Sequence, residues 1–339
     1  MKRRSTVLRG LALAALVTAA GLAAGPAEAQ WKPDKPITVV VPWGAGGSTD
    51  QVVRVVAQEL GKALGQTVVV VNQPGASGSI GTKSVLEGPK DGTMMASGAA
   101  KDLGTYAVTG LLGTKIQDWN LYLAVINASV VGVNTDTPYK SFDDLIKAMK
   151  AKPGSIKVAT AGITSSGGDG LRQIQEAFNV EAKQITYDGG NPAVIATVGG
   201  ETDATTQLGV EEAEMLRAGK LRGLAVLSSR PLKLAGVDEI PAITKYKSDF
   251  KLADNYFGIF LPKGAPKKVT DTLVKIWTDV MPKSEALAKY AQSRGAIVAV
   301  LHGEEAQKAV MPAIQVAAYG LVARNQSKID PATIGIAKP

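Results

Sequence analysis

Cysteine is absent from the sequence, and histidine occurs only once, as His302. The missing thiols exclude disulfides, cysteine nucleophiles and cysteine-ligated metals. His302 stands in Leu-His-Gly-Glu-Glu, a pattern that predicts a loop entering a helix. A Ser-His-Asp triad would have to use this histidine, and the chain has no Gly-x-Ser-x-Gly turn to present a serine. No spacing of histidine and carboxylates suggests a metal site. We therefore predict no enzyme, no catalytic residue, no metal and no cofactor.

Aromatic residues are also few, at 5% of the chain, and beyond residue 29 no basic run is longer than two residues. Nucleic-acid recognition uses clustered basic side chains, often with aromatics between them. We therefore predict no nucleic-acid partner. The formal net charge of +8 would instead attract small anions at long range.

A leader accounts for residues 1–29. Four basic residues flank the start of an apolar stretch over 11–24, and Ala27-Glu28-Ala29 matches a small-residue cleavage site. The apolar stretch is too short for a stable bilayer span, and no later segment has the roughly 20 apolar residues that a span needs. We expect cleavage after Ala29 and a soluble protein in the periplasm.

The segment 42–50, Pro-Trp-Gly-Ala-Gly-Gly-Ser-Thr-Asp, organises the rest of the chain. A β-branched strand over 37–41 precedes it, and a helix over 50–64 follows with an apolar stripe. Its three glycines allow a sharp turn, and Ser48 and Thr49 are expected to cap the helix. The first helical amides would then point into the turn with a partial positive charge. This arrangement predicts a cradle for a small anion.

The two common nucleotide motifs do not fit this turn. A Walker A loop requires a lysine after its glycines, and none follows here. A dinucleotide fingerprint requires a third glycine where Thr49 stands and an acidic residue at the end of the next strand, which ends instead in Asn72. A turn that serves only helix–strand packing is the remaining alternative.

Strands and helices alternate along the chain, which predicts an α/β fold with parallel strands. In the first third we predict strands over 67–71 and 93–97, and a helix that residues 76–81 open and that runs to about 86. The loops 42–50, 73–81 and 97–102 would then meet at one sheet edge. Further on we predict strands over 130–133, 156–160, 184–187, 203–208, 221–227 and 256–261. The later predicted helices cover 141–150, about 165–178, about 192–198, 211–218, about 267–281, 284–295 and 303–321.

Five motifs, in order, give the chain a family resemblance: PWGAGGSTD, VVVVNQPGASGSIG, PKDGTMM, AKPGSIKVATAG and AGKLRGLAVLSS. Together they resemble the Bug-type periplasmic solute-binding proteins of tripartite tricarboxylate transporters. The resemblance implies a two-lobed type II periplasmic-binding-protein fold, each lobe a central sheet flanked by helices, joined by two crossover strands. We expect residues 30–130 plus 256–339 in the first lobe and residues 131–255 in the second.

The resemblance also implies a function. A protein of this family closes on a small carboxylate-bearing solute, here a dicarboxylate or an aromatic carboxylate, and delivers it as a monomer to integral membrane permease subunits. A periplasmic sensor that presents the carboxylate to a membrane receptor kinase has the same fold and is the alternative. A hydrolytic enzyme is a weaker one, because it would depend on His302.

The family grips a ligand carboxylate with backbone amides, hydroxyls and bridging waters rather than with an arginine. By resemblance, the first lobe contributes the turn after the first strand, the Ser77 turn and the loop at Lys101. The second lobe contributes the turn at Thr164 and three later residues. The resulting ligand-binding candidates are Trp43, Gly46, Gly47, Ser48, Thr49, Asp50, Ser77, Gly78, Gly98, Lys101, Gly162, Thr164, Ser165, Ser166, Tyr187, Gly189 and Gln207.

The chain departs from the family at several of these positions. The loop at 164–168 lacks the usual histidine, Gln207 replaces a frequent aspartate, and Lys101 replaces a small polar residue. Losing an acid at Gln207 argues against a ligand with an ammonium group. Simpler roles remain open: Asp50 as a helix cap, Lys101 as a solvated cation and Trp43 as a plug at the sheet edge. Tyr187 is expected in the cleft, because a buried hydroxyl needs a partner.

Overall fold

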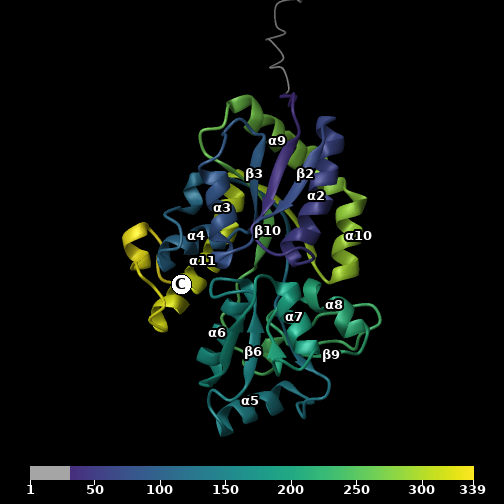
Figure 1. Cartoon of the computed structure of the whole chain (residues 1–339), viewed down its shortest axis with the longest axis vertical. Coiled ribbons are helices and arrows are strands. Elements are labelled where there is room, and N and C mark those ends of the chain that lie inside the picture. Colours follow the sequence, from purple (N-terminus) through teal and green to yellow (C-terminus); the bar gives the residue numbers. More distant parts are fainter. Residues whose placement is uncertain (1–30) are drawn as a thin grey trace, which may run out of the picture.

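The computed structural model describes residues 31–339, so the predicted leader and its cleavage site lie outside the described residues. Two sheets, each flanked by helices, are stacked along the long axis of the molecule (Figure 1). We call the two halves the six-stranded lobe and the five-stranded lobe after their sheets. This arrangement confirms the predicted α/β class with two central sheets.

The six-stranded sheet has the order β11-β4-β10-β3-β1-β2. Strands β1, β2 and β3 are parallel, as predicted, so the loops that follow them meet at one edge. Strands β10, β4 and β11 are antiparallel to their neighbours, which makes the sheet mixed. The six strands are β1 (Ile37–Val41), β2 (Val68–Asn72), β3 (Met94–Ala99), β4 (Trp119–Ile126), β10 (Tyr256–Pro262) and β11 (Ile297–His302).

Helices cover both faces of this sheet. One face packs under α2, α9 and α10, and the other under α3, α4 and α11. The predicted stripe of α2 is buried, with Val52, Val56 and Leu60 each at most 1% exposed. The helices are α2 (Ser48–Leu64), α3 (Ser79–Leu86), α4 (Asp102–Thr109), α9 (Lys267–Asp279), α10 (Glu285–Arg294) and α11 (Gly303–Ala323).

The five-stranded sheet has the order β7-β6-β8-β5-β9. Its strands are β5 (Val130–Asn134), β6 (Lys157–Thr160), β7 (Lys183–Thr186), β8 (Ala204–Thr205) and β9 (Leu221–Val226). Its helices are α5 (Phe142–Ala151), α6 (Ser166–Phe178), α7 (Gly190–Val198) and α8 (Gly209–Arg217). Short 3₁₀ turns over both lobes cover Ala76–Gly78, Ile116–Asp118, Ile243–Lys245, Met281–Lys283 and Pro331–Ile334.

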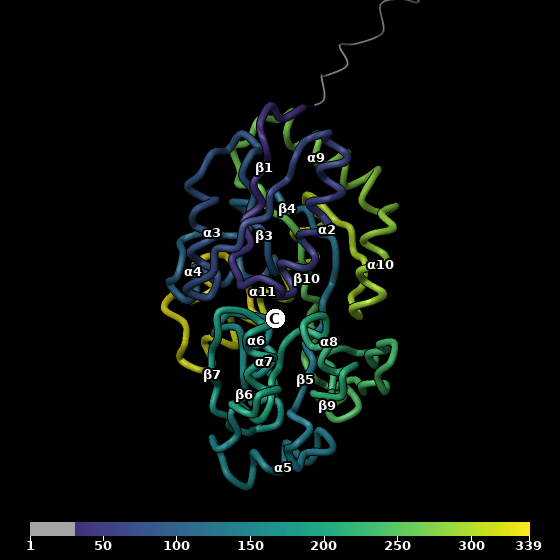
Figure 2. The backbone as a smooth tube through the Cα atoms, turned by 45° about the vertical axis from the view of Figure 1, so that its right-hand side comes forward, coloured from purple at the N-terminus to yellow at the C-terminus, as the bar shows by residue number. Residues whose placement is uncertain are grey.

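The chain passes between the lobes twice, after β4 and before β10. The two crossing segments touch, because the Asn127 N–H donates to the Asn255 carbonyl at 3.0 Å. The strands β5 and β10 next to the crossings belong to different sheets, one in each lobe (Figure 2). Two helix pairs also contact across the boundary, α10 with α8 and α11 with α6.

Several predicted elements need correction. Strands β4 and β11 and helix α4 were not predicted, and His302 ends β11 instead of lying in a loop. The strand expected over 203–208 is only Ala204–Thr205, because the Gln207 carbonyl turns to accept from the Val130 N–H at 2.7 Å. The segment 256–261, expected as a crossover, is a strand in the middle of the six-stranded sheet.

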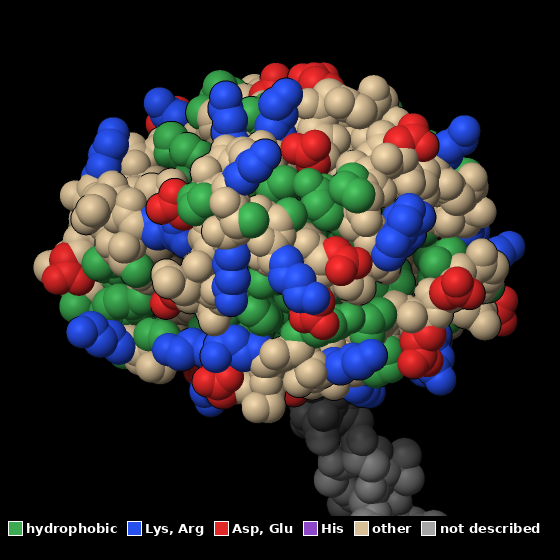
Figure 3. Space-filling view, turned by 90° about the horizontal axis from the view of Figure 1, so that it is seen from below, with side chains coloured by type: hydrophobic (Ala, Val, Ile, Leu, Met, Phe, Trp, Pro, Cys, Tyr) green, Lys and Arg blue, Asp and Glu red, His purple; other side chains and the backbone are tan. Residues whose placement is uncertain are grey.

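The surface carries mixed charge (Figure 3), and the described helices are not of the membrane-spanning kind. On the face formed by the five-stranded lobe, basic and acidic side chains are interspersed (Figure 3). Over residues 31–339, no helix combines the length and the apolar character needed to cross a bilayer.

Candidate functional site

The first helix N-terminus of the site belongs to α2. The helix begins at Ser48 with Gly47 as its N-cap, so the predicted capping by the side chains of Ser48 and Thr49 is wrong. Gly46, at φ +79°, makes the turn that aims these amides toward the boundary between the lobes. The structure thus leaves amides of α2 available to a group from outside the helix.

Asp50 holds this turn in place. Its carboxylate accepts from the Gly46 N–H at 2.9 Å and pairs with Arg54, with the nearest atoms 2.7 Å apart. Burial alone would raise the pKa of Asp50, but hydrogen bonds from Arg54, Gly46 and Asn72 lower it overall. Asp50 therefore supports the turn as an ionised acid within its own helix.

The second helix N-terminus belongs to α6 on the other lobe. Ser165 caps it by accepting from the Gly168 N–H at 3.0 Å, and its hydroxyl donates to the Gly162 carbonyl at 2.8 Å. The next hydroxyl, that of Ser166, accepts from the Asn255 side-chain amide at 2.6 Å, which leaves its own proton free to donate. This is the glycine–hydroxyl–helix arrangement that the sequence predicts.

The two lobes approach closely around these turns. The Gly44 N–H donates across the boundary to the Asp188 carbonyl at 3.1 Å, and a Cβ on Gly44 would lie 2.8 Å from that oxygen. On the other side, a Cβ on Gly162 would lie 2.8 Å from the Ser77 hydroxyl. Only glycine fits at these two positions while the lobes are closed.

A cavity of about 20 Å³ lies between the two turns. Ligand sites are commonly about 300–1,000 Å³, so a solute would fit here only with the lobes further apart than in this structure. The sequence-predicted residues that the structure brings together here are Trp43, Ser48, Thr49, Ser165, Ser166 and Gln207. The cavity is also lined by Ala99, Asp102, Ala161, Gly190, Leu208, Glu211 and Phe257, which the sequence reasoning missed.

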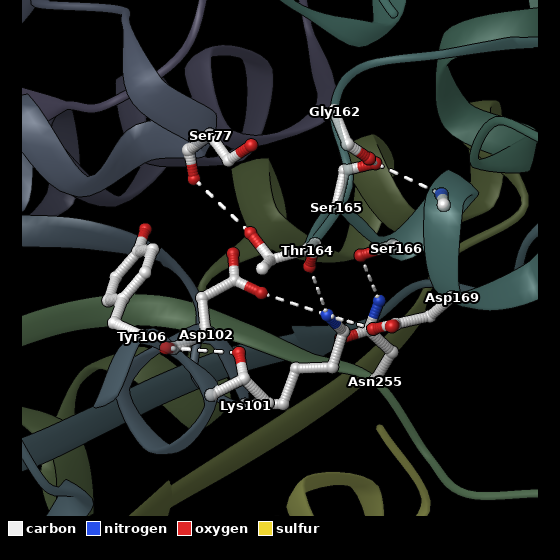
Figure 4. A network of polar contacts seen from close by, with 12 residues as sticks. Ser77, Lys101, Asp102, Tyr106, Gly162, Thr164, Ser165, Ser166, Asp169 and Asn255 are labelled. Carbon is white, nitrogen blue, oxygen red and sulfur yellow. Dashed lines mark hydrogen bonds and ion pairs between the residues drawn. The ribbon is translucent and has the colours of Figure 1, made fainter. Parts of the chain in front are cut away.

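A buried ion network lies beside the cavity and crosses the boundary (Figure 4). The Lys101 ammonium pairs with Asp102 at 2.8 Å in its own lobe, and with Asp169 and the Thr164 carbonyl, the latter at 2.9 Å, in the other. Arg172 pairs with Asp169. Lys101 is 4% exposed, so the prediction of a solvated cation is wrong. Two buried cations and two buried carboxylates thus balance one another in charge.

Burial shapes the ionisation of this network. It lowers the pKa of Lys101 and raises the pKa of Asp102, and in each case the partner charge offsets part of the effect. Asp102 borders both the network and the cavity, so a ligand carboxylate on this side would face an acid already paired with Lys101.

The remaining predicted residues surround the cavity without lining it. Tyr187 points away, and its hydroxyl donates to Glu201 of the same lobe at 2.8 Å. Gly78 packs on the indole of Trp43, which both walls the cavity and fills the sheet edge. The others outside the lining are Gly46, Gly47, Asp50, Ser77, Gly98, Lys101, Gly162, Thr164 and Gly189.

A larger space of about 130 Å³ lies at the crossing segments, lined by Asn127, Ser129 and Asn255 among others. It shares Ser166 with the smaller cavity, and Lys101 and Asp169 also border it. We assign the solute site to the smaller cavity, because the start of α2 and the start of α6 meet there. Over the described residues, no three acidic or histidine side chains are placed to hold a metal ion.

Comparison with known proteins agrees with this geometry. The family model described as "Tripartite tricarboxylate transporter family receptor" matches residues 52–320. Protein BugT of Bordetella pertussis is 29% identical over 307 residues, which cover 88% of this chain and 92% of that protein.

Two solved structures have the same fold. That of the periplasmic binding protein BugD has a TM-score of 0.80 at 26% identity and covers 87% of this chain and 99% of its own. The structure of an R. palustris protein with adipate has a TM-score of 0.74 at 23% identity, and it covers 87% of this chain and 98% of its own. The second similarity concerns the fold alone.

Proposed function

Because this chain belongs to the tripartite tricarboxylate transporter receptor family, we propose that it captures a small carboxylate-bearing solute between its two lobes. In this proposal the mature protein acts in the periplasm as a monomer, after cleavage following Ala29, and delivers the solute to integral membrane permease subunits. Family membership favours this transport role over a sensor that signals to a receptor kinase. It also favours a binding protein over an enzyme.

The observation that carries the proposal is the pair of opposed helix N-termini. Amides at the start of α2 and the free hydroxyl proton of Ser166 at the start of α6 border one small cavity from opposite lobes. Each helix N-terminus favours negative charge, and a carboxylate needs several donors once water is excluded. Over residues 31–339, the cavity lining includes no arginine or lysine, so dipoles and hydroxyls must supply the recognition.

The proposed solute is a dicarboxylate or a small aromatic carboxylate. Adipate, present in the R. palustris fold neighbour, belongs to the first class. The cavity of about 20 Å³ is smaller than such a solute, so binding would require the lobes to move further apart than in this structure. We propose a site made of Trp43, Ser48, Thr49, Ser165, Ser166 and Gln207, with the surrounding predicted residues shaping the turns. A dissociation constant near micromolar, about −8 kcal/mol, would be ordinary for such a site.

The connectivity explains how the solute enters. We propose residues 30–130 plus 256–339 as one lobe and 131–255 as the other, with a hinge at the two crossing segments. Because only two segments join the lobes, few covalent constraints oppose a rotation about them. The solute would select the closed form by contacting both lobes at once.

A thermal-shift panel tests this function. We expect succinate, adipate, malate or benzoate, or a close analogue of one, to stabilise the mature protein, whereas the corresponding neutral amides leave it unchanged. A ligand at 100 times its dissociation constant should add about 2.7 kcal/mol to the free energy of unfolding.

His302→Ala is the matched control. The His302 ring contacts only Thr278 among the described hydrogen bonds, at 3.2 Å, and lies outside the cavity lining. This variant should show the same shifts as the wild type. Stabilisation by the amides alone, or shifts that depend on His302, would contradict the proposed function.

A further inference from the structure

One acidic side chain of the five-stranded lobe occupies the anion cradle of the other lobe. Glu211, in the first turn of α8, accepts from the Ser48 N–H at the start of α2 at 2.7 Å. Its second oxygen accepts from the Leu208 N–H of its own helix at 3.2 Å. The carboxylate is therefore bound to both lobes at once.

The surroundings are shaped for a carboxylate. The Gln207 amide, in the orientation that satisfies its neighbours, donates to Glu211 at 3.1 Å and accepts from the Ala161 N–H at 2.8 Å. The start of α7 closes the other side, where a Cβ on Gly190 would fall 2.1 Å from a carboxyl oxygen of Glu211. Three helix starts, those of α2, α7 and α8, thus meet around one carboxylate.

A purely local role does not account for this geometry. Capping α8 needs only the oxygen that accepts from Leu208. The other oxygen takes the same Ser48 N–H that the proposed solute carboxylate would use. At the α6 turn, by contrast, the Ser166 hydroxyl proton stays free. The two ends of the cavity therefore differ, because one is filled by the protein itself.

We propose that Glu211 is a specificity-determining residue that serves as an internal surrogate for the solute carboxylate. Resting on the proposed function, this inference holds that Glu211 bridges the lobes at Ser48 when no solute is present, and that a solute must displace it. Weak anions would fail to do so, and only a solute that also engages the α6 turn would succeed. The surrogate lowers the apparent affinity in proportion to the fraction of closed protein in which it leaves the cradle free.

Glu211→Ala and Glu211→Gln test the surrogate. The glutamine variant keeps the size, but its amide has one oxygen and so accepts from only one of the two N–H groups. Glu181→Gln, at an exposed acid of the five-stranded lobe, is the control. Small-angle scattering without solute should give a larger radius of gyration for both Glu211 variants than for the wild type and the control.

Calorimetry with adipate and succinate supplies the second readout. If the surrogate occupies the cradle in about nine-tenths of the closed molecules, removing it should tighten binding about tenfold. An unchanged radius of gyration, or weaker binding in the Glu211 variants, would overturn the surrogate. A larger radius in the Glu211 variants, with no carboxylate binding to the variants or to the wild type, would support the bridging role of Glu211 and refute the proposed function. If the Glu211 variants bound the carboxylate as strongly as the wild type and kept its radius, the surrogate would be refuted and the proposed function supported.

Discussion

Glu212 is the least compensated single residue among those the structure describes. It is fully buried, and no hydrogen bond of ordinary geometry reaches either carboxyl oxygen. Burial raises its pKa well above 4.5, the neighbouring charge of Glu211 raises it further, and a contact from the Gln207 backbone offsets this only in part. The folded protein therefore favours the protonated acid.

This environment predicts a pH dependence with a definite sign. Because the folded pKa lies above the unfolded value of 4.5, the folded state keeps its full stability below 4.5 and loses it as the pH rises through the folded pKa. The loss is at most about 1.4 kcal/mol per pH unit. Glu212→Gln cannot ionise, so urea unfolding from pH 4.5 upward should show a flatter profile than the wild type.

Glu214→Gln provides the comparison, since this side chain is exposed and pairs with Arg217 of its own helix and with Arg294 of α10. Its profile should parallel that of the wild type, because exposed ion pairs contribute about 0–1 kcal/mol. If Glu212→Gln and the wild type lost stability equally with rising pH, Glu212 would not be the group that titrates.

At the residue scale, the sequence predicted the turns at the helix N-termini but not the charged side chains that contact these turns across the boundary. Ser165 and Ser166 were placed correctly at the start of α6, because hydroxyls and glycines before a helix carry a local signal. Lys101 and Glu211 could not be placed from the sequence, because their partners lie 63 or more positions away in the chain. The acidic neighbour Asp102 was the one local hint of an ion pair at Lys101.

At the element scale, two adjacent serines at the start of α6 have different roles. Ser165 caps the helix, whereas Ser166 holds a hydroxyl proton that no described partner accepts. We expect Ser165→Ala to lower the free energy of unfolding by about 1 kcal/mol in urea titrations. We expect Ser166→Ala to weaken binding of the best dicarboxylate about tenfold, because a hydrogen bond to a charged group contributes about 1.5–3 kcal/mol.

Ser141 supplies the matched control for the cap. It caps α5, which lies at the far end of the five-stranded lobe from the cavity, by accepting from the Asp144 N–H at 3.2 Å (Figure 1). Ser141→Ala should lose about as much stability as Ser165→Ala and keep wild-type affinity. Equal affinities for Ser166→Ala and Ser141→Ala would place the solute away from α6.

At the element scale, periodicity predicted the parallel strands and the amphipathic helices well. It failed at β4 and β11, which pair in antiparallel fashion with distant strands, and their positions depend on tertiary contacts. Helix α4 was also missed: all eight of its residues are buried, so no polar face marks its period. The three loops at the edge of the parallel strands were predicted because strand direction alone places them.

At the scale of the whole molecule, the closed form rests on polar contacts between the lobes. The Gly44–Asp188 hydrogen bond, the Lys101 network and the Glu211–Ser48 contact all cross the boundary. An apolar cluster also crosses the boundary, because Ala161, Leu208 and Val210 of the five-stranded lobe share one core cluster with Trp43 of the other lobe. Opening the lobes therefore breaks these polar contacts and separates packed apolar side chains. A solute that replaces one of these contacts can shift the balance between open and closed forms.

Calorimetric titration of the best dicarboxylate beside its dimethyl ester tests the central claim most directly. The ester keeps the size and the apolar chain of the acid but carries no negative charge for the helix N-termini to favour. We predict that the ester binds at least tenfold more weakly than the acid, a difference of about 1.4 kcal/mol or more. Equal affinity of acid and ester would contradict a carboxylate site between the two lobes.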